Sequence, residues 1–260
     1  MQQQLLMWVP FIFTLSVLTF ASVLDFKKRT VPNWVWLFAY PIGCIMTLTE
    51  LAINLIDVQT ILVSFGVSLL LGAILLYTGF YGGADVKALV FIGLTVPMLP
   101  LMLNPVLSVP ALPLVLVVFC NSSLLSMVWP LFIFILNLKD IVKGKQLFEG
   151  INLTIREKVL LLFTTRRIPI EKLGKNLRYF PAEEVVLQED GKPTKKLLHL
   201  MKAETNLSKH VNKLKEHPEL CEKGVLASPT IPATAFFTLA LTTAPIGILL
   251  FWIITLFGIR

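Results

Sequence analysis

The sequence predicts an all-α polytopic membrane protein of about six transmembrane helices, with a small α+β domain inserted between the fifth and the sixth. Three observations support this fold class. Hydrophobic residues make up 55% of the 260 residues, and the mean hydropathy is +0.77. Only 15% of the residues are charged, compared with about 25% in ordinary soluble domains. Most of these charges fall in one block, residues 138–228, which holds 18 of the 23 Lys and Arg residues and 12 of the 16 Asp and Glu residues.

Six stretches are apolar and long enough for membrane spans, which need about 20 residues. They are 5–24, 34–53, 61–80, 86–103, 111–137 and 231–257. We interpret the first as a membrane helix and not as a secretory signal, because no basic residue precedes it. The chain is therefore expected to divide into a membrane domain (1–137), a polar domain (138–228) and a segment that carries the last helix (229–260).

The short loops between these spans predict the orientation, because Lys and Arg are enriched in cytoplasmic loops. Bases occur at 27–29, at Lys87 and at 139–145, whereas the loops 54–60 and 104–110 contain none. We therefore expect a multi-pass protein of the cell membrane with its N-terminus outside. The loops that hold the bases and the whole polar domain would then lie on the cytoplasmic side.

Within the polar domain, three patterns predict local structure. Residues 153–170 mix β-branched and apolar residues and favour strands. The turn signal "EDGKP" occupies 189–193, and 195–217 has apolar residues at helical spacing, typical of an amphipathic helix packed on its own domain. The net charge of this block, +6, includes many acids. It favours a face near anionic lipid over nucleic-acid binding.

The cysteines predict no metal site. Cys44, Cys120 and Cys221 lie far apart and form no CxxC pair or Cys/His cluster. The sequence therefore predicts neither a zinc site nor a disulfide framework, and no cofactor.

Two aspartates lie at the predicted cytoplasmic boundary of the membrane. Asp25 ends the first span, and Asp85 precedes the fourth. Ionisable groups at membrane depth normally face the interior of a bundle or a wet cavity. A pair of carboxyl groups that shares one proton is what aspartic proteolysis requires. A proton- or cation-coupled transporter that uses Asp25 and Asp85 is the alternative, although its ion site would be expected nearer the bilayer midplane.

The residues around Asp85 have predicted supporting roles. Gly82 and Gly83 would let the chain turn sharply and leave room for an extended substrate. If Asp85 opens a helix, the helix dipole favours its ionised form, which suggests Asp85 as base and Asp25 as acid. The bases at 27–29 argue for the opposite assignment. Lys87 is expected to reach the membrane interface, and Asn33 to cap the second span.

At these residues the sequence resembles the type IV prepilin peptidase superfamily of GxGD intramembrane aspartic proteases, and within it the archaeal prearchaellin (preflagellin) peptidases. Asp25, followed by "KKRTVPN", matches the first aspartate motif. The stretch Gly82-Gly83-Ala84-Asp85-Val86-Lys87 matches GxGDxK, with Ala84 in place of the second motif glycine. The segments "RYFPAEE" (178–184) and "SPTIPATAFF" (228–237) are also similar to this branch.

The resemblance implies six membrane helices, an inserted soluble domain and catalytic roles for Asp25 and Asp85. It also implies cleavage of the basic leader from archaellin or pilin-like precursors at the cytoplasmic membrane face. No methyltransferase activity is expected, since the paired CxxC motifs of bifunctional members do not occur. An inactive scaffold of archaellum or pilus assembly is a second alternative. Four acids, Glu183, Glu184, Glu189 and Asp190, are interpreted as solvated surface, with binding of the basic leader as the alternative.

Overall fold

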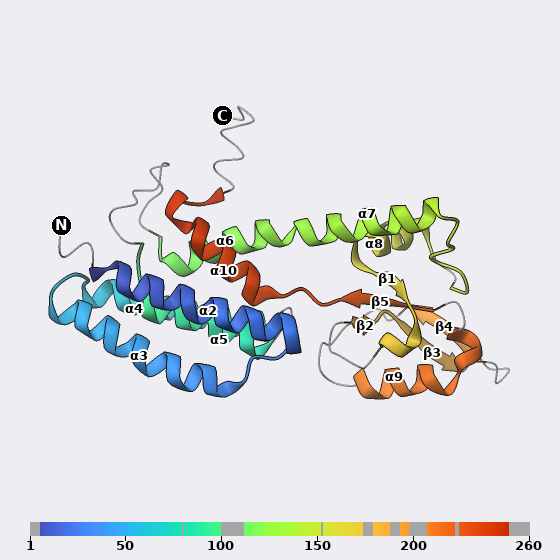
Figure 1. The fold of residues 1–260 in the computed structure, drawn as a ribbon, viewed down its shortest axis with the longest axis horizontal. Helices are drawn as coiled ribbons and strands as arrows, with labels where there is room; N and C mark the ends of the chain where they lie inside the picture. Colours follow the sequence, from blue (N-terminus) through green and yellow to red (C-terminus); the bar gives the residue numbers. More distant parts are fainter. Residues whose placement is uncertain are drawn as a thin grey trace, which may run out of the picture. The chain divides into compact units, whose positions relative to one another are not determined.

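The computed structural model describes residues 6–79, 81–99, 112–151, 153–173, 179–187, 193–197, 207–221 and 224–249. Two compact units contain them (Figure 1). The helical unit comprises Met1–Ser126 and Pro232–Arg260, and the inserted unit comprises Met127–Ile231. The chain thus leaves the helical unit once and returns to it.

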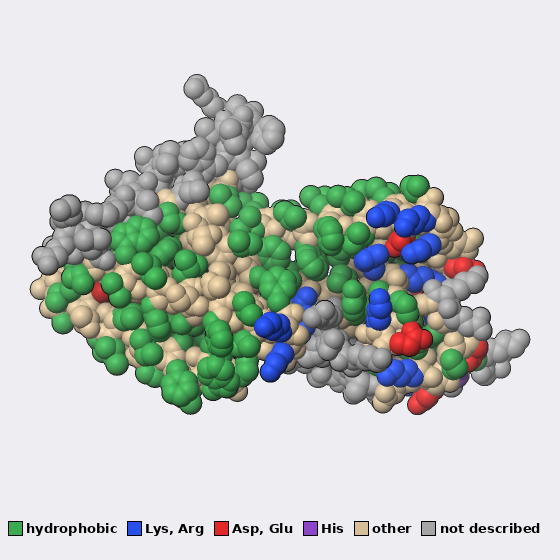
Figure 2. Space-filling view, viewed as in Figure 1, with side chains coloured by type: hydrophobic (Ala, Val, Ile, Leu, Met, Phe, Trp, Pro, Cys, Tyr) green, Lys and Arg blue, Asp and Glu red, His purple; other side chains and the backbone are tan. Residues whose placement is uncertain are grey.

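The helical unit is a bundle of α-helices. Its helices are α2 (Trp8–Lys28), α3 (Asn33–Ala52), α4 (Val58–Thr78), α5 (Gly83–Thr95), α6 (Leu114–Ser126) and α10 (Ala233–Thr243), followed by the 3₁₀ helix η3 (Ala244–Ile246). Figure 2 shows hydrophobic side chains over much of the visible surface of this unit. Several are largely exposed, among them Leu37, Phe38 and Leu70. Such a surface is typical of a protein that faces lipid.

Four helices in the described part of the chain are long and apolar enough to cross a membrane. They are Trp8–Lys28, Asn33–Ala52, Val58–Thr78 and the continuous stretch Leu114–Val142. The described part of the predicted fourth span is the shorter helix α5, and residues 100–103 lie outside the described residues. The described part of the predicted sixth span is α10 with η3, and residues 250–257 also lie outside.

Helix α5, which carries Asp85, is the central helix of the bundle. It packs against α2, α3, α4, α6 and α10. Ala88, Leu89, Phe91 and Ile92 are fully buried. After its first turns, which carry Asp85 and Lys87, α5 is apolar on all sides, and such a helix belongs in an interior. This explains why α5 lies inside the bundle although it has only 13 residues.

Glycines allow α5 to lie close to α4. A Cβ on Gly93 would lie 2.5 Å from the Ser68 Cβ and 3.0 Å from the Ser64 carbonyl oxygen. A Cβ on Gly72 would lie 2.8 Å from Val86 Cγ1. Small residues at such contacts let membrane helices approach closely, so the position of Asp85 depends on them.

Substituting Gly93→Ala is expected to force α4 and α5 apart and to destabilise the bundle by about 1–3 kcal/mol, the usual cost of overpacking. The matched control is Gly66→Ala, because a Cβ at Gly66 of α4 meets nothing within 4 Å. Thermal unfolding of the full chain in detergent checks this. Equal melting temperatures for the two variants would show that the contact is not tight.

The inserted unit contains helices and short antiparallel strands. Its helices are α7 (Val128–Val142), α8 (Ile155–Thr164), α9 (Leu207–Glu216) and the 3₁₀ helices η1 (Ile170–Lys172) and η2 (Pro218–Cys221). The strands are β1 (Arg166–Ile168), β2 (Tyr179–Pro181), β3 (Glu183–Leu187), β4 (Pro193–Leu197) and β5 (Val225–Pro229). The strand order is β1-β5-β2 in one sheet, and β3 pairs with β4 in a hairpin. A small α+β region is therefore confirmed.

Two predictions for this unit need correction. Most of 153–170 is helix α8, and only the short strand β1 bears out the strand prediction. Thr154 and Glu157 favour the helix because they form a capping box in which the Thr154 amide donates to Glu157 Oε2 at 2.8 Å. The predicted helix 195–217 is a strand at 195–197 and a helix only over Leu207–Glu216, and residues 198–206 lie outside the described residues. The packing of this helix on its own unit is confirmed, because Val211 and Leu214 are buried in the core with Ile168 and Val225.

Candidate active site

Asp25 lies in the last turn of α2, with its side chain towards α10. Its Oδ2 accepts a hydrogen bond from the Thr234 hydroxyl at 3.1 Å. Its backbone carbonyl accepts from the Arg29 amide at 2.8 Å, and Arg29 ends the helix in the left-handed conformation with φ of 55°. Hydrogen bonds therefore fix both the side chain and the backbone carbonyl of Asp25.

Asp85 lies in the first turn of α5. Its Oδ2 accepts a hydrogen bond from the Gly82 amide at 3.2 Å. The helix begins at Gly83, earlier than predicted. Ala84, the departure from the GxGD pattern, packs against the core of the bundle, so a small apolar side chain fits this position.

The predicted turn at Gly82 and Gly83 is wrong. Gly82 has an extended backbone, with φ of −77° and ψ of 164°. The chain leaves α4 through Gly79 instead, whose φ of 71° lies in the left-handed region that favours glycine. A Cβ on Gly83 would meet nothing within 4 Å, so the space beside this residue is open.

The structure brings Asp25 and Asp85 together. Helices α2 and α5 pack against each other, and the two carboxyl groups are close enough to interact electrostatically. Tyr81 lies in the same region: burial raises the pKa of its phenol, the charge of Asp85 raises it further, and a hydrogen bond with Ser123 opposes both. Two carboxyl groups that repel each other favour a state in which they share one proton. This arrangement can supply a general base and a general acid from one site.

Lys87 and Asn33 are in contact, and the prediction that Asn33 caps the second span is wrong. The Lys87 ammonium donates to Asn33 Oδ1 at 2.7 Å. Asn33 is the first residue of α3 and makes no capping hydrogen bond. The Lys87 carbonyl also accepts from the Tyr40 hydroxyl at 2.8 Å. These contacts join the start of α3 to the first turns of α5, next to Asp85.

Helix α10 contributes residues that the sequence interpretation missed. Thr234 is fully buried and contacts Asp25. Thr238, one turn further, shares a hydrogen bond with Ser22 of α2 at 2.8 Å. The Phe237 ring stacks on Tyr81, with centroids 5.9 Å apart. The available signal was the four-residue spacing of Thr234 and Thr238 in a mostly apolar helix, which places both on one face.

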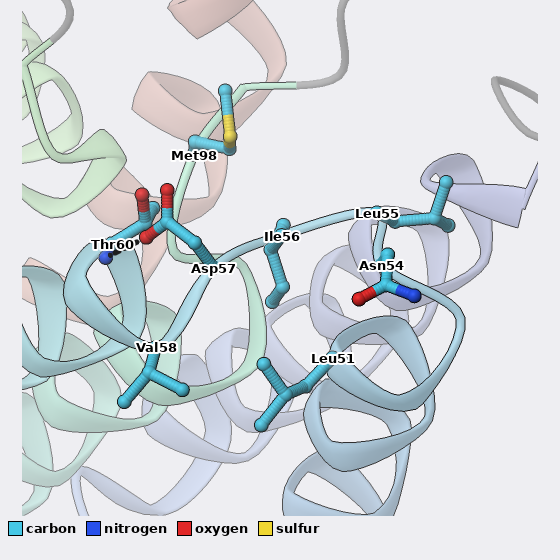
Figure 3. Close-up of a pocket in the computed structure, with 8 residues that line it drawn as sticks. All are labelled: Leu51, Asn54, Leu55, Ile56, Asp57, Val58, Thr60 and Met98. Carbon is cyan, nitrogen blue, oxygen red and sulfur yellow. Dashed lines mark hydrogen bonds between the residues drawn. The ribbon is translucent and has the colours of Figure 1, made fainter.

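Two cavities are lined by residues other than the two aspartates. One, of about 520 Å³, is lined by residues between the end of α3 and the start of α4, including Asn54, Asp57 and Met98 (Figure 3). It is at the opposite end of α3 from Asn33, about 30 Å along a helix of 20 residues. The other, of about 560 Å³, belongs to the inserted unit and is lined by charged groups such as Asp140, Arg167 and Glu171. Neither cavity is lined by Asp25 or Asp85.

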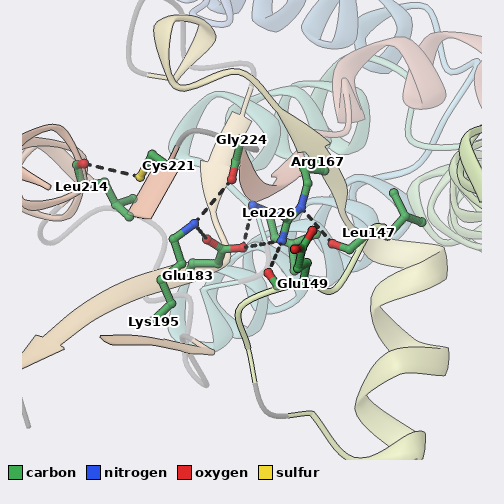
Figure 4. Close-up of polar contacts among 9 residues, drawn as sticks. All are labelled: Leu147, Glu149, Arg167, Glu183, Lys195, Leu214, Cys221, Gly224 and Leu226. Atoms are coloured by element: carbon green, nitrogen blue, oxygen red, sulfur yellow. Dashed lines mark hydrogen bonds and ion pairs between the residues drawn. The ribbon is translucent and has the colours of Figure 1, made fainter. Parts of the chain in front are cut away.

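Glu183 is not a surface acid, which corrects both interpretations of it. Its side chain is fully buried. The Lys195 ammonium lies 3.0 Å from Oε2, the Leu226 amide donates to Oε1 at 2.9 Å, and Arg167 lies 3.9 Å from Oε1 (Figure 4). A carboxylate with these partners is not available to a basic leader. Glu184 is half-buried, and Glu189 and Asp190 lie outside the described residues.

Comparison with known proteins identifies the helical part of the chain. Residues 12–138 match the type IV leader peptidase family. The chain is also similar to the preflagellin peptidase of Methanococcus voltae, with 26% identity over 174 residues that cover 64% of this chain and 74% of that protein. Asp25 and Asp85 both lie in the matched segment, whereas most of the inserted unit lies beyond it. The segment that carries both aspartates is thus similar to the type IV leader peptidase family.

Proposed function

We propose that the protein is a membrane-embedded aspartic endopeptidase with Asp25 and Asp85 as its catalytic pair. The observation that carries the proposal is that two carboxyl groups from packed helices of the family segment, α2 and α5, lie close enough for the charge of Asp25 to act on Asp85. No metal or cofactor is needed for this chemistry.

The pair would hydrolyse a peptide bond through a tetrahedral species. The ionised aspartate takes a proton from water as the water oxygen bonds to the carbonyl carbon, and the protonated aspartate donates its proton to the carbonyl oxygen. Collapse of this species returns the proton from that oxygen to the second aspartate. The C–N bond then breaks, and the first aspartate gives its proton to the leaving nitrogen. The pair ends with one proton, as it began.

We propose as substrates archaellin or type IV pilin-like precursors, in which a basic leader precedes an apolar helix. The name of the Methanococcus voltae relative supports this class. Cleavage would occur at the cytoplasmic membrane face, because the bases of the short loops flank both aspartates. The open space beside Gly83 and the exposed Gly82 would admit an extended substrate backbone.

We also propose six membrane helices, with the fourth containing α5 and the sixth containing α10. In this topology the membrane domain is 1–137, the cytoplasmic domain is 138–228, and 229–260 carries the last helix. The apolar character of α5 and α10 supports the count. The many charges of residues 138–228, part of which Figure 2 shows, support a cytoplasmic position for this domain.

The test is cleavage of a preflagellin precursor by the purified full chain in proteoliposomes, with the new N-terminus identified by mass spectrometry. We expect cleavage directly after the basic leader, and none by the double variant Asp25→Asn/Asp85→Asn. Ion flux that depends on Asp85, without cleavage, would instead establish the transporter alternative. A protein with neither activity would be a scaffold.

A further inference from the structure

Thr234 is the partner of Asp25 that the sequence did not reveal. It is fully buried in α10 and donates its hydroxyl to Asp25 Oδ2. We propose that Thr234 is a positioning residue, which fixes the side chain of Asp25 and favours its ionised form. This inference rests on the proposed function and assigns the roles within the pair.

The geometry supports a fixed orientation. Threonine is branched at Cβ, which restricts the direction of its hydroxyl. Helix α10 packs against both α2 and α5, and the hydrogen bond between Thr238 and Ser22 ties α10 to α2 one turn away. Two hydrogen bonds, Thr234 to Asp25 and Thr238 to Ser22, therefore fix α10 against α2 and orient the Thr234 hydroxyl towards Asp25.

The hydrogen bond also bears on which carboxyl group carries the charge, and the bond that Asp85 accepts from the Gly82 amide acts in the opposite sense. A hydroxyl that donates to a carboxylate stabilises the ionised form. The charged groups that act on Asp25 are Arg29, at the end of its own helix, and Asp85 on α5. Like the Thr234 hydroxyl, the positive charge of Arg29 favours the ionised form of Asp25. A negative charge on Asp85 would oppose the ionisation of Asp25, but it is absent when Asp85 holds the shared proton. Asp25 is then the base that takes the proton from water, and Asp85 is the acid, the reverse of the assignment that the helix dipole suggests.

The experiment compares three variants of the full chain in the precursor cleavage assay. Thr234→Val keeps the shape but removes the hydroxyl, and Thr234→Ser keeps the hydroxyl. Thr238→Val is the matched control, because it removes a hydrogen bond between the same two helices that involves no aspartate. We expect Thr234→Val to lower kcat about tenfold to a hundredfold, the effect of one hydrogen bond to a charged group.

The pH dependence separates this role from a structural one. With Thr234→Val, the acidic limb of the pH–rate profile should move to higher pH, while KM changes little. In Thr234→Ser and Thr238→Val, the acidic limb should stay at the same pH as in the wild type. The kcat of Thr234→Ser should stay within about threefold of the wild-type value. If Thr234→Val does not fold, Thr234→Ala replaces it, and Thr234→Ser must then be at least tenfold more active.

Two results would overturn the proposal. One is a Thr234→Val protein with wild-type kcat and an unchanged acidic limb. The other is equal loss of activity in Thr234→Val, Thr234→Ser and Thr238→Val, which would indicate helix packing alone. In both cases Asp25→Asn would still be inactive. If Asp25→Asn is instead active, the proposed catalytic pair fails, and this outcome is distinct from the other two.

Discussion

Asp85→Asn is expected to lower the rate of precursor cleavage by about a thousandfold or more, and Asp25→Asn by a similar factor. Each substitution leaves a side chain of nearly the same shape that can neither hold nor release the shared proton. Residues that act as a unit show non-additive losses. The double variant should therefore be no slower than the slower single variant, and the rate of single-turnover cleavage in proteoliposomes measures this.

Asp57→Asn is the matched control for these substitutions. Asp57 caps α4 by accepting a hydrogen bond from the Thr60 amide at 2.6 Å and lines the cavity at the other end of α3. Asparagine is an equally good cap, so this variant should cleave at the wild-type rate. More than a tenth of the wild-type rate in either single variant of the pair, with normal thermal stability, would contradict the catalytic role.

The second large effect concerns stability. Glu183→Gln should destabilise the inserted unit by about 3–5 kcal/mol, because it leaves the buried ammonium of Lys195 without a counter-charge. The side chain of Lys195 is only 4% exposed. Hydrogen exchange of β5 amides in the full chain measures the loss, since the Leu226 amide donates to Glu183.

Two further variants test whether the buried pair is the cause. Glu183→Gln/Lys195→Met removes both charges and should cost less than the sum of the single substitutions. Glu219→Gln, which alters an exposed pair with His217, should leave the exchange of β5 unchanged. Additive losses in the double variant would show that the two buried charges do not stabilise each other.

Local patterns were sufficient to predict several features. The apolar stretches indicated a membrane protein, and three of the six predicted spans coincide closely with α2, α3 and α4. The motifs around Asp25 and Asp85 identified the family, which the comparison confirmed. The residues of the capping box, Thr154 and Glu157, stand in the sequence, but the prediction for this segment followed its β-branched composition and did not include α8.

The sequence by itself determined the class of protein, the resemblance to a family and the two candidate aspartates, because apolar length, loop charge and short motifs are all read along the chain. Only the tertiary structure decided which groups surround those aspartates. Thr234 is 209 residues from Asp25 in sequence and contacts it only because α10 returns to the bundle after the inserted unit. Likewise, Glu183 looks like any solvated acid until the partner strands place Lys195 and Leu226 beside it. Burial and partners are properties of packing between distant segments, and no local pattern records them.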